Sequence, residues 1–233
     1  YSYAKQLIAS KQDDKAESIL VQGRKTFGKA DILDHALASI YIKNKKNLDE
    51  AESLLQSAIK QYPTFNRYRL DLATLLIINE EYSLALKHLN IAHKQEPLNQ
   101  EIWAYKGICW RLLNDERSKW LNNYDLLIFP QELPTPVGYK NINAFINDLG
   151  EYLNEKHTSN NSPLDQSVVG GTQTMGNLLK DNHRIIQSYK SSLSTAVQNY
   201  LDRLPDDPTH PFLSRYNNKF KFSGCWSVLL NQD

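Results

Sequence analysis

The sequence has few of the features that mark secreted, membrane or nucleic-acid-binding proteins. It contains only two cysteines in 233 residues, Cys109 and Cys225, and they form no CxxC pair. A disulfide scaffold needs more cysteines, so we expect a reducing, cytoplasmic setting. A run of 18 apolar residues is also lacking, and Lys plus Arg (27) nearly balance Asp plus Glu (26). We therefore expect neither a membrane nor a nucleic acid as a partner.

What the first half does contain is a spacing that recurs every 34 to 35 residues. The segments DDKAESILVQGRKTFG, LDEAESLLQSAIKQYP and EYSLALKHLNIAHKQEP share it. Each has an alanine, a leucine four residues later and a small residue three further on: Ala16, Leu20 and Gly23; Ala51, Leu55 and Ala58; Ala85, Leu89 and Ala92. Pro63 and Pro97 should end the second and third helices, because proline lacks an N–H and restricts the residue before it.

A second helical pattern precedes these segments. Leu37, Ala38 and Tyr41 recur as Leu72, Ala73 and Leu76, and then as Trp103, Gly107 and Trp110. The small members let two helices approach closely, and the large ones fill the space between layers. This order resembles the tetratricopeptide (TPR) repeat. The resemblance implies that residues 1–128 form an all-α superhelix of about 3.5 repeats, cut at its start, with Ala4 and Leu7 in an incomplete first helix.

TPR arrays usually bind a protein or a peptide in a groove, and the resemblance implies such a partner here. The candidate groove residues are polar side chains expected on the exposed face of each first helix: Lys43, Asn44, Asn66, Arg67 and Arg69. The alternative is that they are ordinary solvated positions. After the array, Lys119 takes the place of the small residue, so we expect the helix near 115–128 to be a junction.

The composition changes after residue 128. FPQELPTPVGY has three prolines and a glycine, so residues 129–140 should form a linker. Apolar residues at helical spacing predict helices in NINAFINDLGEYLNEKH and over 181–204, the second packed against β structure through Ile186, Tyr189, Leu193 and Tyr200. Alternation and aromatic content predict a strand over 219–230. Gly-Gly-Thr-Gln-Thr, at 170–174, is unsuited to a helix.

Four segments in this half carry a further resemblance: WLNNYDLLIFPQELPTPVGY, PLDQSVVGGTQTMGNLL, LPDDPTHPFL and FSGCWSVLL. In this order they are similar to the beginning of a 2-oxoglutarate/Fe(II)-dependent oxygenase domain, which bacterial proteins often carry behind TPR repeats. The resemblance implies an α+β chain in which residues 141–233 start a double-stranded β-helix (jelly roll), with the Gly-Gly-Thr-Gln-Thr string as an early edge strand and loop. The full protein would hydroxylate a substrate while converting 2-oxoglutarate to succinate.

Such oxygenases hold iron with two histidines and a carboxylate. None of the six histidines here begins a His-x-Asp or His-x-Glu sequence. In the resembled family the histidine-bearing strand follows SGxWSVxL, and here only three residues follow Leu230. We therefore expect a fragment that lacks the iron ligands, and we assign no metal ligand and no catalytic residue. Fe(II) and 2-oxoglutarate are expected for the full-length parent and none for this chain alone.

The residues that remain as candidates for contact with cofactor or substrate are Thr172, Gln173, Thr174, Cys225, Trp226 and Ser227. Side chains alternate along a strand, so Cys225 and Ser227 should share one face and Trp226 the other. The alternative is an ordered turn with satisfied polar side chains. For the whole chain the alternative is a non-catalytic TPR scaffold with a degenerate C-terminal cap. A TPR-fused transferase is weaker, because no phosphate-binding glycine loop supports it.

Overall fold

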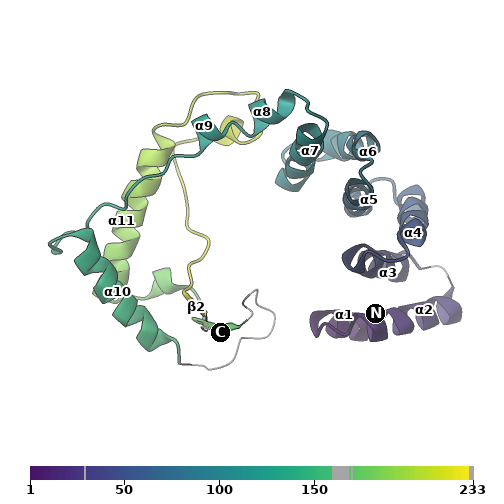
Figure 1. The fold of residues 1–233 in the computed structure, drawn as a ribbon, viewed down its shortest axis with the longest axis horizontal. Helices are drawn as coiled ribbons and strands as arrows, with labels where there is room; N and C mark the ends of the chain where they lie inside the picture. The colour runs from purple at the N-terminus through teal and green to yellow at the C-terminus, as the bar shows by residue number, and fades with distance from the viewer. Residues whose placement is uncertain (29, 159–167, 169, 231–233) are drawn as a thin grey trace. The chain divides into compact units, whose positions relative to one another are not determined.

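The computed structural model describes residues 1–28, 30–158, 168 and 170–230, and it is mostly helical with one small sheet (Figure 1). The fold class is therefore α+β, as expected. Contacts within the chain divide it into two compact units, Tyr1–Asn123 and Tyr124–Asp233. In the described residues no helix combines the length and the apolar character that crossing a bilayer requires.

The first unit is a series of helices in which each packs against the next along the chain. The helices are α1 (Ser2–Ala9), α2 (Asp13–Phe27), α3 (Asp31–Asn44), α4 (Leu48–Gln61), α5 (Asn66–Ile78), α6 (Tyr82–Gln95), α7 (Gln100–Leu112) and α8 (Arg117–Leu121). The prediction of a mostly helical first half is confirmed. The expected junction helix near 115–128 is wrong in extent, because the chain leaves the helical conformation at Asn122 and resumes it only in α9 (Tyr124–Leu127).

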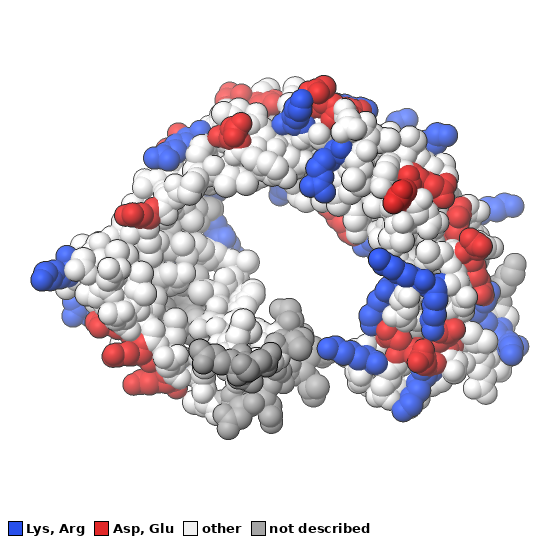
Figure 2. Space-filling view, in the orientation of Figure 1, with Lys and Arg blue, Asp and Glu red and all other residues white. Residues whose placement is uncertain are grey.

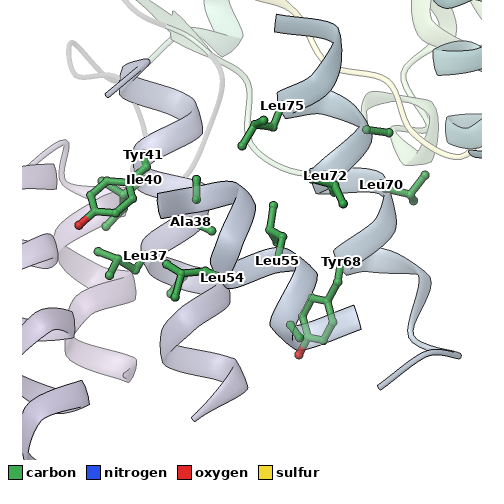
Figure 3. Close-up of a cluster of buried hydrophobic side chains, with 14 of the residues drawn as sticks. Leu37, Ala38, Ile40, Tyr41, Leu54, Leu55, Tyr68, Leu70, Leu72 and Leu75 are labelled. Carbon is green, nitrogen blue, oxygen red and sulfur yellow. The ribbon is translucent and has the colours of Figure 1, made fainter. Parts of the chain in front are cut away.

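The recurring small residues lie where the helices meet. Ala16, Ala51 and Ala85 are wholly buried, and so is Ala73. A Cβ added to Gly107 would stand 3.0 Å from Cδ2 of Leu121, so this glycine lets α8 approach α7 closely. The prediction that Ala73 and Gly107 are buried is confirmed. Figure 3 shows the large partners, with leucines of α4 packed among side chains of α3 and α5.

The first helix of each pair ends in the same backbone turn. A residue with positive φ follows each of these helices: Lys11, Lys45, Glu80 and Asn114, at 58°, 50°, 63° and 55°. The amide of the next residue donates to a carbonyl five residues back, on Leu7, Tyr41, Leu76 and Trp110, over 2.8 to 3.0 Å. These acceptors are the large residues of the sequence pattern. The repeat is therefore present in the backbone as a helix-ending motif that satisfies the last carbonyls in the same way four times.

This turn gives a matched pair of substitutions. A left-handed conformation costs a residue with a Cβ about 1–2 kcal/mol, whereas glycine adopts it freely and asparagine tolerates it. Glu80 is exposed. Glu80→Gly removes the left-handed cost but gives the unfolded chain more conformational entropy, so the free energy of unfolding should rise by a net of about 0.5–1 kcal/mol. Asn114→Gly should raise it less. Urea unfolding measures both, and a loss of stability in Glu80→Gly would contradict the assignment.

The second helices end before proline, as expected. α4 and α6 stop at Gln61 and Gln95, and the residues between them and the prolines, Tyr62 and Glu96, have ψ of 71° and 70°. These ψ values lie outside the helical range, because the proline ring disfavours a helical residue before it.

The second unit contains α9, α10 (Ile142–Lys156), β1 (Gly171–Gln173), the short 3₁₀ helix η1 (Leu178–Lys180), α11 (Arg184–Leu201), η2 (Leu213–Arg215) and β2 (Val228–Leu230). Its core forms between α10 and α11, from Phe145, Ile185 and Ile186. The expectation that the helix predicted over 181–204 packs against β structure is therefore wrong for this core, because α10 supplies the apolar partner. Leu193 is only half-buried, whereas Ala196 on the same helix is buried.

The predicted linker, residues 129–140, lies along α11. Gln131 donates to the carbonyl of Ala196 at 2.6 Å, and Ser192 donates to the carbonyl of Pro134. The ring of Phe129 meets that of Tyr200, with centroids 5.6 Å apart. The segment therefore packs as part of the second unit.

The sheet is a single antiparallel pair, with Gly171 opposite Leu230 and Gln173 opposite Val228. The strand expected over 219–230 is wrong in length, because only its last three described residues have a partner strand. Gly171 is needed where the two backbones approach, since a Cβ there would meet the carbonyl oxygen of Leu229. The expectation that the glycine string contains a strand is confirmed for Gly171–Gln173; residues 163–167 and 169 lie outside the described residues.

Candidate functional site

A network of charged side chains joins three of the first helices. The guanidinium of Arg67 on α5 donates through Nη1 and Nη2 to both carboxylate oxygens of Glu101 on α7, each at 3.0 Å. Its Nε donates to Asp71 at 2.9 Å, and the other oxygen of Asp71 contacts Nε2 of His35 on α3. Burial lowers the pKa of Arg67, but Glu101 and Asp71 more than offset this and raise it. Arg67 therefore fixes neighbouring helices, and each of its three guanidinium nitrogens already donates a hydrogen bond.

Two of the predicted groove residues are not exposed. Asn66 is 4% exposed, and its Nδ2 donates at 2.7 Å to Glu96, the residue that follows α6. Arg69 is 9% exposed, and its Nη2 donates to the carbonyl of Pro63 at 3.1 Å. The expectation that these two side chains lie on an exposed face is wrong. Asn66 instead links α5 to the residue that follows α6, and Arg69 links α5 to the turn after α4, contacts that the spacing alone does not reveal.

Lys43 and Asn44 are the exposed members of the predicted set. Lys43 Nζ lies 2.8 Å from a carboxylate oxygen of Asp13 on α2, and this contact lowers the pKa of Asp13. Figure 2 shows that basic and acidic side chains are interspersed on the face it presents. Whether Lys43 and Asn44 contact a partner stays a prediction.

In the second unit the predicted polar residues gather around a histidine that the sequence reasoning missed. His157 follows the last residue of α10, Lys156. Its Nδ1 lies 2.8 Å from Oγ1 of Thr172 on β1, and its Nε2 lies 3.0 Å from Oγ of Ser227, just before β2. The ring therefore links the end of α10 to β1 and to the residue that precedes β2. Each hydroxyl can donate or accept, so the ring can make both contacts in either tautomer.

The other candidates divide by exposure. Thr174 is buried, and its Oγ1 accepts from the amide of Ser227 at 2.9 Å. The amide of Cys225 donates to Oδ1 of Asn177 at 3.1 Å, and burial raises the pKa of the Cys225 thiol, so it is neutral at neutral pH. Trp226 is 55% exposed, whereas Cys225 and Ser227 are half-buried. The expected alternation, with Cys225 and Ser227 on one face and Trp226 on the other, stays a prediction, because these three residues precede β2 (Val228–Leu230).

A polar pocket of about 260 Å³ opens beside this cluster. His157, Thr172, Gln173 and Thr174 line one part of it, and Lys156 and Asp181 line another. The structure therefore brings three predicted residues to one pocket with His157.

Asp181 is held as a carboxylate by three neighbours. Tyr152 donates to it at 2.6 Å, the amide of His183 at 2.9 Å, and Nζ of Lys156 lies at 3.1 Å. The hydrogen bond from Tyr152 is the largest cause that lowers the pKa of Asp181 well below its ordinary value. The pocket therefore has a fixed negative charge beside a paired ammonium group.

Removing the His157 ring should loosen the sheet. Thr172 is 8% exposed, so His157→Phe would leave a buried hydroxyl without its partner, at a cost of about 1–3 kcal/mol. Faster hydrogen exchange at the amide of Thr174, which donates to the carbonyl of Ser227 at 3.0 Å, would report it. Met175→Ala is the control, because that side chain is 90% exposed and should change stability by less than about 0.5 kcal/mol. Equal exchange in both variants would contradict the linking role.

The Asp181 contacts should contribute a pH-dependent stability. The folded pKa lies below the unfolded value of about 3.9, so the contribution is present above that value and is lost as pH falls through the folded pKa. The stability difference between wild type and Asp181→Asn should be constant above about pH 5 and shrink below about pH 4. Urea unfolding at several pH values measures it, with the exposed Asp206→Asn as control. A difference that grows on acidification would contradict this assignment.

In the described ranges, no three His, Cys, Asp or Glu side chains lie together in a way that could hold a metal ion. His157 and His210 are occupied by hydroxyl or backbone partners, and His35 contacts a single carboxylate. The donor groups described in this structure therefore do not fit Fe(II).

A scan against models of protein families and a search of curated proteins found no match to this chain.

Proposed function

We propose that residues 1–123 are a TPR-type array that binds a protein or peptide, joined to the beginning of a 2-oxoglutarate/Fe(II)-dependent oxygenase domain in a bacterial, cytoplasmic protein. The observation that carries the first part is the turn that recurs after α1, α3, α5 and α7, with the same hydrogen bond to the residue at the large position. Wholly buried alanines on the second helices at the same period support it further.

The arrangement of polar contacts favours the first helices as the binding surface. The Arg67 network holds α3, α5 and α7 in register, so side chains on these helices keep a fixed spacing. A rigid surface loses little entropy when a flexible peptide binds to it. Lys43 and Asn44 are the exposed residues of the predicted set. They lie at the end of α3, the helix that contributes His35 to this network.

The partner site is tested by panning a random peptide library against residues 1–233 and mapping the enriched peptides by amide chemical shifts. We expect shifts on α3, α5 and α7. Lys43→Glu should weaken a bound peptide by several-fold, because it reverses one charge at an exposed position. Lys60→Glu, on α4, is the matched control. Shifts confined to α2, α4 and α6 would reject the first helices as the binding surface.

The oxygenase part rests on the sequence resemblance and on one supporting feature. The segment Gly171–Gln173 of the glycine string pairs with Val228–Leu230 of FSGCWSVLL. Two segments of the resemblance therefore lie side by side as strands, which supports the proposal that they belong to one domain. The donors described here do not fit Fe(II), so on this proposal the ligands come from outside the described residues, and we derive no catalytic step through the metal.

The second candidate is a non-catalytic TPR scaffold in which residues 124–233 cap the array. It is favoured by the His157 cluster, in which the polar groups satisfy one another. An iron titration on residues 1–233 and on the full product of its gene separates the two candidates.

A further inference from the structure

A pocket at the C-terminal end of α11 combines an apolar wall with two cations. Its volume is about 350 Å³, within the range of about 300–1,000 Å³ that is usual for small-ligand sites. The wall is formed by Leu201, Leu204, Phe212, Leu213 and Tyr216. Phe212 and Tyr216 are 43% and 39% exposed, so a ligand can reach both rings. We call this site the α11-end pocket.

The charge of this pocket has one sign. Arg215 and Lys219 line it, and no acidic residue does. In the part of the chain that the structure describes, neither side chain forms an ion pair. Two cations that share one pocket repel each other, and an anion between them relieves this. A guanidinium group also matches the planar geometry of a carboxylate.

The loop that forms the wall is held in place before any ligand binds. His210 is 2% exposed, and its Nδ1 accepts from the amides of Phe212 and Leu213, each at 3.2 Å. Asp207 accepts from the amide of Thr209 at 2.9 Å. Farther along, Gln198 on α11 donates to Asn218 at 2.5 Å. A wall fixed in this way lowers the entropy that a ligand must overcome.

We propose that the α11-end pocket binds a small carboxylic acid with an apolar body. The carboxylate lies between Arg215 and Lys219, and the apolar body lies against Phe212, Leu213 and Tyr216. An apolar wall gives no gain to a small, fully hydrated anion such as phosphate, whereas an alkyl or aromatic group buries its surface there. The carboxylate can belong to a free acid or to the C-terminal residue of a peptide, since both present the same chemistry. The site is independent of the iron chemistry and of the TPR surface.

Titration of residues 1–233 with octanoate, followed by amide chemical shifts, tests the proposal. We expect saturable shifts at residues 213–219 with a Kd on the order of 1 mM or tighter, and binding of 1-octanol that is roughly tenfold weaker. The double variant Arg215→Gln/Lys219→Gln should reduce octanoate affinity by roughly tenfold and leave octanol unchanged. Lys221→Gln is the control, since Lys221 is exposed and does not line the pocket.

The second arm uses acetyl-Ala-Ala-Leu as the free acid and as the C-terminal amide. Tighter binding of the peptide acid than of octanoate identifies a chain terminus as the source, and the reverse identifies a free acid. The proposal is overturned by equal affinity for octanoate and octanol, by unchanged octanoate affinity in the double variant, by shifts outside the pocket, or by no saturation up to about 10 mM.

Discussion

Phe145→Ala should remove about 3–5 kcal/mol from the free energy of unfolding of the second unit. The phenyl ring is wholly buried between α10 and α11, against Ile185 and Ile186, and it meets the ring of Tyr139 with centroids 5.0 Å apart. Truncation removes the buried apolar surface and leaves a cavity that the surrounding helices fill only in part. A domain is stable by about 5–15 kcal/mol in total, so this single change should remove a large share of the unit's stability.

Ile146 provides a matched control on the same helix. It is the next residue, but its side chain is 52% exposed. Ile146→Ala changes helix propensity by a similar amount and creates no cavity, so it should shift stability by no more than about 0.5 kcal/mol. Hydrogen exchange of the α10 and α11 amides measures both variants. Equal costs at the two positions would show that α10 does not bury Phe145 as described.

Leu89→Ala should cost the first unit about 2–5 kcal/mol. Leu89 is wholly buried on α6, in the position occupied by Leu20 and Leu55 in the preceding copies. Its side chain fills the contact between α6 and its neighbours α5 and α7. Because each helix of the array packs mainly on adjacent helices, the cost should spread to α5 and α7 more than to α1.

The control is Ile91→Ala on the same helix, where the side chain is 42% exposed. We expect a change within about 0.5 kcal/mol. Urea unfolding gives the total cost, and hydrogen exchange gives its distribution along the helices. A cost for Ile91→Ala that equals that of Leu89→Ala would mean that the repeat register is displaced.

The helices of the first unit could be predicted because the sequence repeats what the packing requires. Small residues at a fixed period are needed wherever two backbones approach, and the alanines at 16, 51 and 85 satisfy that need. The polar contacts could not be predicted in the same way. Arg67 and Glu101 are 34 residues apart, and their pairing depends on the angle between α5 and α7. For this reason residues expected on an open groove proved to be buried or paired.

The second unit was predictable only in its local patterns. The apolar stripe identified α11, whose end at Leu201 precedes the predicted end at 204 by three residues. The alternating sequence over 219–230 favours a strand, but a strand forms only where another strand runs alongside it. In the described residues β1 pairs with Val228–Leu230, while Ser227 and Cys225 accept single hydrogen bonds from the amides of Thr174 and Leu178. His157 was missed because Ser227 is 70 residues away along the chain. No local signal joins the two.

An anaerobic Fe(II) titration combined with a succinate assay tests the proposed function most directly, run on residues 1–233 and on the full product of its gene. For residues 1–233 we predict no stoichiometric Fe(II) binding and no succinate, because the described side chains include no suitable set of donors. For the full product we predict one Fe(II) per chain and succinate that depends on 2-oxoglutarate. Succinate from residues 1–233 would show that their own side chains form the site, and its absence from the full product would reject the oxygenase in favour of the scaffold.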